Sequence, residues 1–274
     1  MTNHDQAQGT WPNAPLALVL AQVRFDPEVD TEYKAVAGRL KAALGERFPA
    51  MKPVRQAMFV FGNLPIPQDA PSTNGGEVGR ELRTDDTRSA LRVQEGVMTY
   101  TTSLYKDSPH FLAEWRSMLD CLCAAGGVKV QRMGLRYIDF IVPAADKAPE
   151  NYFKEGFSRA PSALAEAPPL TAFMSYEYSK GDGEVMRVQF GRGIAPPSLP
   201  PDLDGSVQPP PALLDRYTEG PSAVLDMDRW RMDSRRLQAE EIADEFRRFR
   251  DDIRTAFNAI ITPEARAEWS GKVA

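Results

Sequence analysis

The sequence is short of the residues that most catalytic and metal sites use. Its 274 residues include only two cysteines and two histidines, and its formal net charge is −5. Cys121 and Cys123 are separated by one residue, a spacing that disfavours a disulfide within a helix, so we expect reduced thiols. No set of cysteines and histidines has zinc-ligand spacing. The acidic balance argues against a surface devoted to nucleic acid.

Phosphate-binding and membrane-spanning motifs are missing as well. The sequence has neither a Walker-type loop nor a Gly-x-Gly-x-x-Gly motif. The longest apolar stretch, PLALVLA at residues 15–21, is far too short to cross a bilayer. The first fifteen residues lack the basic segment and apolar core of a signal peptide. We therefore expect a cytoplasmic protein without a cofactor, a metal, a membrane contact or a nucleic-acid partner.

The hydrophobic pattern that is present predicts a mixed α+β fold. Short runs of β-branched, aliphatic and aromatic residues predict strands at residues 16–25, 54–62, 80–84, 89–94, 97–103, 128–142, 170–180, 185–191 and 223–230. Capping residues and apolar spacing of three and four predict helices from 30 or 31 to 44, from 108 to about 125, and over 152–157, 234–260 and 262–269. The helix over 234–260 has the most regular apolar spacing.

The order of these elements suggests an internal duplication. After an irregular tail over 1–15, residues 16–127 and 128–274 each begin with a long strand and end with a long helix. Pseudo-duplicated units of this kind predict curved antiparallel sheets with long helices, as in TATA-binding-protein-like and helix-grip folds. A proline-rich excursion over 194–221 interrupts the second half. Because proline disfavours helices and central strands, we expect an irregular segment suited to contact a partner.

Three short motifs carry a resemblance to a known family. They are NAPLALVLAQVRF near the start, GLRYIDFIVP in the middle, and LDMDRW followed by a long helix and ITPEARAEW at the end. In this order they resemble a sporadically distributed bacterial family of uncharacterised conserved proteins of similar length. Such a patchy distribution implies a defence or toxin-linked role. The sequence departs from the family pattern in its closing helix, which lacks an expected histidine, so any role of that histidine is in doubt.

The strand over 128–142 contains two charged residues that need partners. Arg136 and Asp139 are three residues apart, so in a regular strand their side chains point to opposite faces. A buried guanidinium without a partner is costly, which leads us to expect a carboxylate from another strand. Asp226 and Asp228 alternate with apolar residues and are the obvious candidates. Arg24 occupies the matching position in the first half of the sequence.

Three interpretations of these residues stay open from the sequence alone. The candidate ligand-binding residues are Arg24, Arg136, Tyr137, Asp139, Asp226, Asp228 and Trp230. They form either structural ion pairs, or a polar pocket for an anionic ligand, or a metal site built on the two alternating aspartates. No catalytic residue can be assigned, because the usual nucleophile–base pairs are missing.

The preferred hypothesis is a non-enzymatic binding or regulatory component, with a protein partner or a homo-oligomer, in a bacterial defence or toxin-linked complex. One alternative is a metal-dependent nuclease or phosphodiesterase that uses Asp226, Asp228 and Asp139, with Arg136 as an anion clamp. Another is a small-ligand sensor whose ligand lies between the sheet and the closing helix, lined by Arg136, Tyr137 and Trp230.

Overall fold

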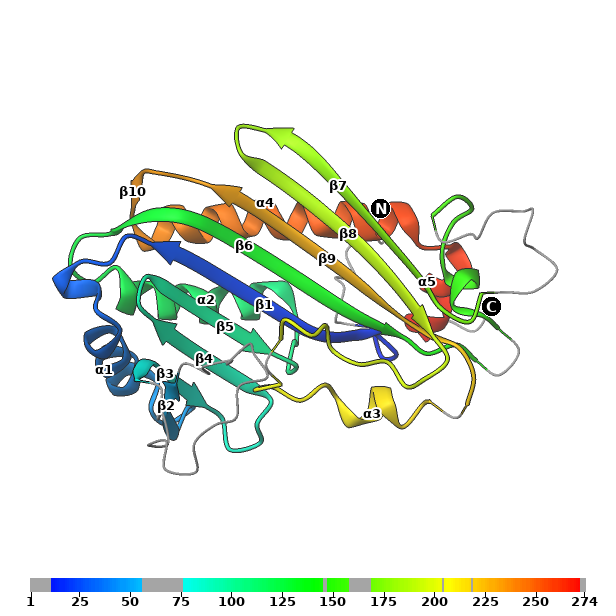
Figure 1. Ribbon diagram of the computed structural model, residues 1–274, viewed down its shortest axis with the longest axis horizontal. Helices are drawn as coiled ribbons and strands as arrows, with labels where there is room; N and C mark the ends of the chain where they lie inside the picture. The colour runs from blue at the N-terminus through cyan, green and yellow to red at the C-terminus, as the bar shows by residue number, and fades with distance from the viewer. Residues whose placement is uncertain are drawn as a thin grey trace, which may run out of the picture.

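The chain folds around one curved antiparallel sheet that carries long helices on one face (Figure 1). The computed structural model describes residues 11–55, 76–144, 147–157, 169–203, 205–217 and 219–271. Its strands are β1 Leu16–Phe25, β2 Ala50–Arg55, β3 Glu77–Arg83, β4 Ser89–Gln94, β5 Val97–Thr102, β6 Val128–Ile141, β7 Ala172–Gly181, β8 Glu184–Gly193, β9 Ser222–Met232 and β10 Arg236–Leu237. The helices are α1 Tyr33–Leu44, α2 Ser108–Leu122, α3 Pro211–Leu214, α4 Ala239–Ile260 and α5 Pro263–Trp269, with 3-10 turns η1 Val29–Thr31 and η2 Pro149–Tyr152.

The strands follow the order β2-β3-β4-β5-β1-β6-β9-β8-β7, and β10 pairs with β6 outside this path. The two long strands β1 and β6 therefore lie side by side at the centre of the sheet. On each side of this centre the remaining strands follow in reverse chain order. They are β5, β4, β3 and β2 next to β1, and β9, β8 and β7 next to β6. The α+β class is confirmed, and the described strands form one continuous antiparallel sheet.

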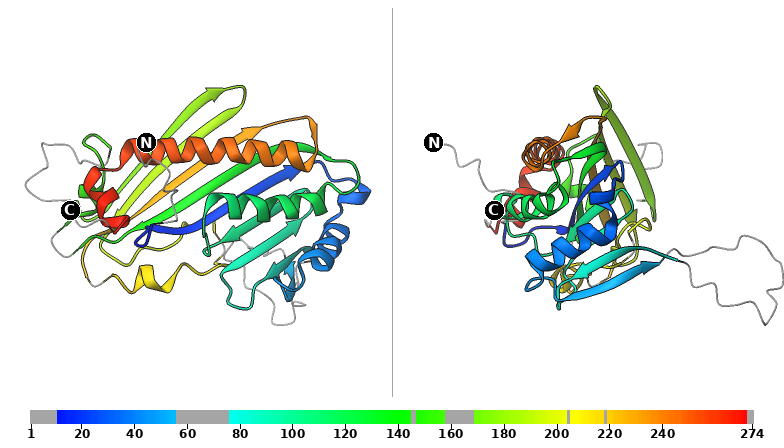
Figure 2. Two further views of the ribbon diagram at one scale, coloured as in Figure 1. Left: turned by 180° about the vertical axis from the view of Figure 1, so that it is seen from behind. Right: turned by 90° about the vertical axis from the view of Figure 1, so that its left-hand side faces the viewer.

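Helices α1, α2 and α4 cover one face of the sheet, which we call the helix face (Figure 2). The apolar residues of α2 and α4 pack together and onto the central strands, with the rings of Trp115 and Phe246 5.4 Å apart. Asp107 caps α2, since its Oδ1 accepts a hydrogen bond from the backbone N–H of His110 at 2.8 Å. The expected cap, Ser108, is instead the first helical residue, next to Pro109.

Several predicted boundaries were wrong for local reasons. Helix α4 begins at Ala239, not near residue 234, because Arg236 and Leu237 first pair with β6 as strand β10. Helix α1 begins at Tyr33, after the residues expected to cap it have formed η1. No helix forms over 152–157, because the 3-10 turn η2 ends at Tyr152 and Phe153 then bridges to Ile261. The strand expected over 54–62 begins at Ala50, and residues 56–62 lie outside the described residues.

The opposite face of the sheet, which we call the groove face, has a thinner cover. The proline-rich excursion crosses it and places Leu203, Val207 and Leu213 against Leu18 and Phe140 of the central strands. Contrary to our prediction, its described residues pack on the sheet and include the four-residue helix α3. Proline at the first positions of α3 is compatible with a helix start, which our exclusion of helix had overlooked. No helix in the described part of the chain is long and apolar enough to cross a membrane.

The described part of the N-terminal tail is anchored to the end of the chain. Trp11 is buried, and its ring lies 6.4 Å from the Trp269 ring of α5 and 6.2 Å from the Phe257 ring of α4. The backbone N–H of Asn13 donates to the carbonyl of Trp269 at 3.0 Å. From Trp11 to Pro15 the tail contains no helix or strand, and Trp11 is packed into the core. Residues 1–10 lie outside the described residues.

Candidate functional site

Strand β6 explains how a buried strand holds both an arginine and a carboxylate. Its side chains alternate, so Leu135 and Tyr137 lie in the core of the helix face while Arg136 and Ile138 lie on the groove face. Asp139 follows the parity of Tyr137. The predicted separation of Arg136 and Asp139 onto opposite faces is therefore confirmed.

Arg136 holds two carboxylates from different parts of the chain. Its Nε and Nη2 donate to the two oxygens of Asp226, on the neighbouring strand β9, at 2.8 and 2.6 Å. Its Nη1 and Nη2 donate to Asp202, in the proline-rich excursion, at 2.5 and 3.2 Å. Burial lowers the pKa of Arg136, but these hydrogen bonds outweigh burial and leave its pKa above the ordinary value. The predicted ion pair with Asp226 is present, and Asp202 was not foreseen.

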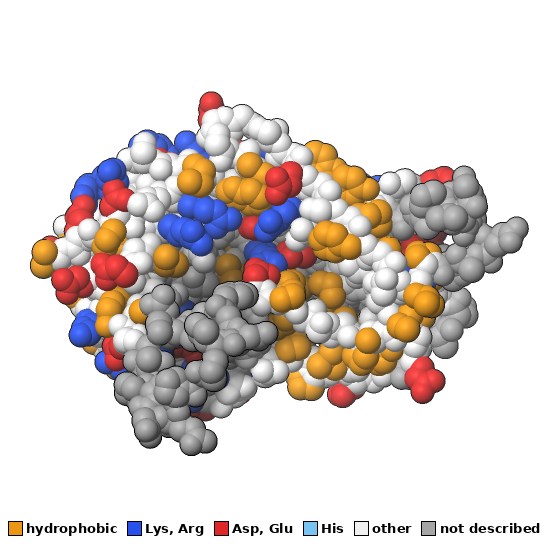
Figure 3. All heavy atoms as spheres, viewed as in Figure 1, with side chains coloured by type: hydrophobic (Ala, Val, Ile, Leu, Met, Phe, Trp, Pro, Cys, Tyr) orange, Lys and Arg blue, Asp and Glu red, His pale blue; other side chains and the backbone are white. Residues whose placement is uncertain are grey.

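The guanidinium of Arg136 borders a groove of about 510 Å³ on the groove face. The walls come from the residues of β1, β4, β5, β6, β8 and β9 that point away from the helices, and from the excursion. Its arginines are Arg24, Arg92, Arg132, Arg136 and Arg187, and its lining carboxylates are Asp202 and Asp228. Basic side chains gather near the middle of this face, with acidic and apolar side chains around them (Figure 3). Arginine thus dominates the ionisable groups of the groove.

Two of these arginines enclose an indole ring. The guanidinium carbons of Arg132 and Arg187 each lie 5.3 Å from the centre of the Trp230 ring. Gly134 permits this arrangement, because a Cβ atom built there would lie 3.2 Å from Arg132 Nη1. Both arginines also share one carboxylate, Asp228, at 3.6 Å from Arg132 Nη2 and 3.3 Å from Arg187 Nη2.

The shared carboxylate does not neutralise its surroundings. Burial lowers the pKa of Arg132, Asp228 raises it, and the neighbouring Arg24, Arg187 and Arg136 lower it further. Burial also raises the pKa of Asp228 more than the arginines lower it. In addition, Arg187 Nε is buried and has no hydrogen-bond partner among the described residues. The groove is therefore short of negative charge.

Arg24 lies on the rim of the same groove. Its Nε donates to Gln22 Oε1 at 3.1 Å, and Gln22 also accepts from Arg132 Nη1 at 3.3 Å. Within the described residues, no carboxylate lies within ion-pair distance of Arg24, so the salt bridge considered for it is not found there. Arg24 and Arg136 do line one groove together with Asp228.

Tyr137 and Asp139 do not join this site. Tyr137 is buried against the helix face, where its hydroxyl donates to Tyr105 Oη at 3.2 Å, and burial raises its pKa well above the ordinary value. Asp139 is fully buried. It lies opposite Leu225 of β9 in the strand register, on the face of the sheet away from the groove. A cavity that combines Arg136, Tyr137 and Trp230 is therefore excluded by strand parity. The sensor hypothesis placed its ligand between the sheet and the closing helix, but the groove lies on the opposite face of the sheet from that helix.

The same parity separates the three carboxylates of the nuclease alternative. Asp226 and Asp228 share the groove face, but Asp139 lies across the sheet, and Asp226 is bound by Arg136. In the described ranges no group of three or more histidine, cysteine or acidic side chains could hold a metal ion. The convergence that this alternative requires is not present.

The residues that sequence reasoning missed fall into two groups. Arg132 could have been found, because the alternation that places Arg136 on the groove face places Arg132 there too. Arg92 and Arg187 lie on β4 and β8, and the sequence does not indicate that these two strands border one groove. Asp202 lies in an irregular segment, where no periodicity predicts the direction of a side chain.

Comparisons with known proteins do not assign a function to this chain, so the assignment depends on the geometry of the site. No protein-family model matches this chain, and no curated protein matches it. The resemblance to a sporadically distributed bacterial family stays a prediction.

Proposed function

We propose that this chain is a non-enzymatic binding protein whose groove holds an oxyanion-bearing ligand, a phosphate or a carboxylate on a small molecule. The observation that carries the proposal is the charge imbalance at the centre of the groove. Arg132 and Arg187 share the one carboxylate of Asp228, and Arg24, which has no carboxylate within ion-pair distance among the described residues, lines the same groove. An incoming oxyanion would offset their mutual repulsion and would accept hydrogen bonds from planar donors suited to it.

Asp202 supports this assignment as an internal example of the expected ligand group. Its side chain is 63% exposed, yet both of its oxygens accept hydrogen bonds from the largely buried Arg136. Arg136 thus already holds a carboxylate that reaches it from outside the sheet. The volume of the groove, about 510 Å³, falls within the roughly 300–1,000 Å³ range of small-molecule sites.

The non-enzymatic part of the proposal rests on the placement of the few candidate catalytic groups. His110 lies on α2, where its Nε2 is 2.9 Å from Glu114 Oε1, on the helix side of the sheet. Burial raises the pKa of Cys123 to about 12, which disfavours the reactive thiolate. We propose, from the family resemblance alone, that binding serves a bacterial defence or toxin-linked complex.

We also propose that the two halves are copies of one ancestral unit. Aligning Gln22–Phe25 with Gly134–Tyr137 aligns Arg24 with Arg136 and also the starts of β1 and β6. Gln22 and Gly134 are then equivalent to each other, and they pair directly across the two central strands. An approximate two-fold axis through this pair would pass through the groove, which both residues line.

The test is binding of two probes, inorganic phosphate and pyrophosphate, measured by calorimetry and by thermal shift. We expect pyrophosphate to bind the unmodified protein and to raise its Tm. Arg24→Ala, which breaks no ion pair among the described residues, should weaken binding about tenfold, or about 1.4 kcal/mol. The matched control is Arg254→Ala on the outer surface of α4, where Arg254 pairs with Asp251 at 3.6 Å. Failure of both anions to bind, or equal binding by the two variants, would refute the proposal.

A further inference from the structure

The two edges of the sheet differ in how they are protected. An unpaired edge strand exposes a row of N–H and C=O groups, and proteins usually block it with charge, proline or a short length. Edge strand β2 has six residues and includes Lys52, Pro53 and Arg55. Edge strand β7 has ten residues and no proline, and its only basic residue, Lys180, donates to Asp252 of α4 at 2.5 Å.

Strand β7 also exposes apolar side chains on both of its faces. Phe173 is 68% exposed on the groove face, and Tyr178 is 54% exposed on the helix face. Tyr178 stacks on Tyr176 with ring centres 6.4 Å apart, and Met174 lies in line with them on the same face. The tip of the β7–β8 hairpin extends beyond α4 (Figure 1), and Tyr178 is exposed, whereas Tyr176 is partly buried with its ring 5.9 Å from that of Phe157.

We propose that β7 pairs antiparallel with β7 of a second copy of this chain, about a two-fold axis perpendicular to the sheet. Such an axis places the groove faces of the two copies on the same side of the extended sheet. Each residue of β7 then opposes a partner residue whose side chain points to that same side, so only registers that oppose two odd-numbered or two even-numbered residues are allowed. A register centred on Glu177 would oppose Glu177 with its own copy, which is unfavourable. A register centred on Tyr176 places Tyr178 against the partner's Met174, twice per dimer, and Glu177 against the partner's Ser175.

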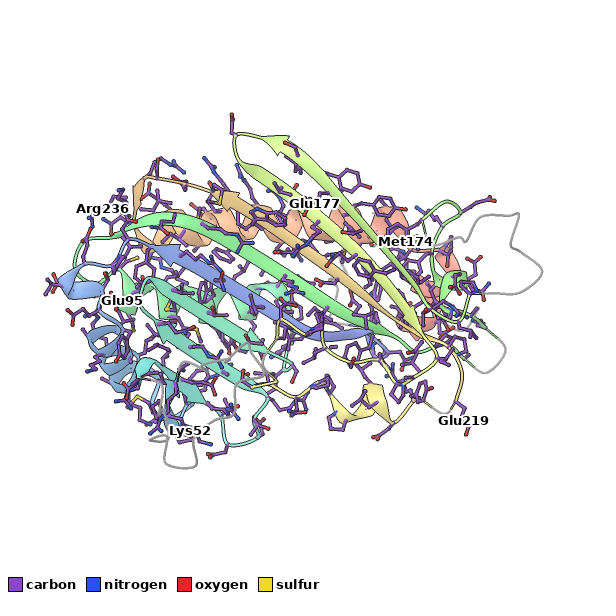
Figure 4. The ribbon with its side chains drawn as sticks, viewed as in Figure 1. Lys52, Glu95, Met174, Glu177, Glu219 and Arg236 are labelled. Atoms are coloured by element: carbon purple, nitrogen blue, oxygen red, sulfur yellow. The ribbon has the colours of Figure 1, made fainter. Side chains whose placement is uncertain are left out.

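A second copy is favoured over a different partner because the edge is complementary to itself. In this register Glu177 opposes the partner's Ser175 and Lys180 opposes the partner's Ala172, so no like charges face each other directly. The symmetric register gives each exposed tyrosine a thioether to contact, a favourable pairing. Met174 and Glu177 mark this edge in Figure 4, and Lys52 marks the protected edge across the molecule. The dimer would extend the sheet through β7 and leave both grooves on one face.

The first test is the solution mass of the full chain by light scattering over a concentration series. The expected mass is twice the 30.4 kDa of one chain. Tyr178→Lys places a charge on the edge and should raise the dimer dissociation constant at least tenfold without changing the circular dichroism spectrum. The matched control Lys52→Glu, on β2, should leave the dimer intact. A monomer at every concentration, or a dimer that only Lys52→Glu disrupts, would overturn the proposal.

The second test fixes the register by cross-linking. In the proposed register Tyr176 opposes its own copy, with Cα atoms about 4.5–5.5 Å apart, within reach of a disulfide. Tyr176→Cys should therefore form a covalent dimer on mild oxidation, and Glu177→Cys should not. Efficient cross-linking of Glu177→Cys alone would exclude the proposed register. Neither test depends on the groove, so a failed dimer would leave the anion-binding proposal standing.

Discussion

The two faces of one sheet use the same strands for different purposes. On β6, Leu135 and Tyr137 point into an apolar core beneath the helices, while Arg132 and Arg136 point into the groove. Alternation along the strand places these residues only one position apart. The helix face therefore supplies most of the stability, and the groove face can hold groups that stability alone would not select.

One arginine from each face makes the contrast sharper. On the helix face Arg229 is 1% exposed, and its Nε donates to Asp252 at 2.8 Å, its Nη2 donates to Glu184, and its guanidinium lies 5.0 Å from the Phe249 ring centre. On the groove face Arg187 shares one carboxylate with Arg132 and has an Nε without a hydrogen-bond partner in the described structure. Arg229 has all of its donors satisfied, whereas Arg187 is partly exposed in the groove and keeps one donor without a partner in the described structure. Under the anion-binding proposal, this difference separates a structural arginine from a binding one.

The largest expected effect comes from the core of the helix face. Phe246→Ala removes a fully buried ring that packs against Trp115 and Phe249, so it should lower the free energy of unfolding by about 4 kcal/mol. Urea unfolding followed by fluorescence measures this loss. The control Val29→Ala changes a side chain that is 82% exposed and should alter stability by less than about 0.5 kcal/mol. A loss below about 1 kcal/mol for Phe246→Ala would contradict this assignment of the core.

The second effect should come from the ion pair beneath the groove. Arg136→Met leaves the buried Asp226 without its guanidinium partner and should cost about 3 kcal/mol. The double variant Arg136→Met, Asp226→Leu removes both charges and should recover most of that loss. Chemical denaturation of the two variants gives the comparison. If the double variant were as unstable as the single one, the cost would come from packing and not from the unpaired carboxylate.

Much of this contrast was predictable where a simple period applies. Alternation correctly assigned Arg136 and Asp139 to opposite faces, and the spacing of apolar residues located α4 to within a few residues of its start. The pair Glu95-Gly96 also predicts a tight hairpin between β4 and β5, and in the structure it joins the paired residues Gln94 and Val97, with a φ of 67° at Gly96.

What could not be predicted depends on contacts between distant segments. Arg187 meets Arg132 and Trp230 only because β8 pairs with β9 and β9 with β6, an order that no local pattern encodes. Asp202 meets Arg136 because apolar residues of the excursion, such as Leu203 and Val207, pack on the sheet. Composition suggested that this segment was free to contact a partner. Proline content indicates that a helix or a central strand is disfavoured, but it does not indicate which surface the segment covers.

A carboxylate outside the groove should give a smaller, pH-dependent effect. Asp233 accepts hydrogen bonds from the Arg235 side chain and from the backbone N–H groups of Ser234 and Arg235, which lower its pKa from 3.8 to about 2. A carboxyl group whose pKa is lower in the folded state than in the unfolded state stabilises the protein at pH values above its unfolded-state pKa. Its contribution should be complete above about pH 4 and should fall as the pH drops towards 2.

Asp233→Asn tests this pH dependence by removing the ionisable group. The variant should be less stable than the unmodified protein by about 1 kcal/mol at pH 6, and the difference should shrink towards zero near pH 2. Thermal unfolding at several pH values measures both. The control Asp215→Asn changes an exposed carboxylate in the excursion. A constant difference between Asp233→Asn and the unmodified protein across this pH range would mean that the effect is not electrostatic.

The smallest expected change in stability is also the most informative about the groove. Asp202→Ala removes an exposed carboxylate from Arg136, which keeps Asp226, so the free energy of unfolding should fall by no more than about 1 kcal/mol. The guanidinium that Asp202 occupied becomes available to an incoming oxyanion. Pyrophosphate should therefore bind Asp202→Ala more tightly than the unmodified protein, by about three- to tenfold, which corresponds to roughly 0.7–1.4 kcal/mol.

Titration calorimetry of Asp202→Ala beside Arg24→Ala then separates two interpretations of the excursion. If Asp202 competes with the ligand, the two substitutions change the affinity for pyrophosphate in opposite directions. If Asp202 only anchors the excursion that walls the groove, both substitutions weaken binding, because loss of the wall exposes the site to water. The second outcome would retain the anion site and would reassign Asp202 from a competitor of the ligand to a part of the wall.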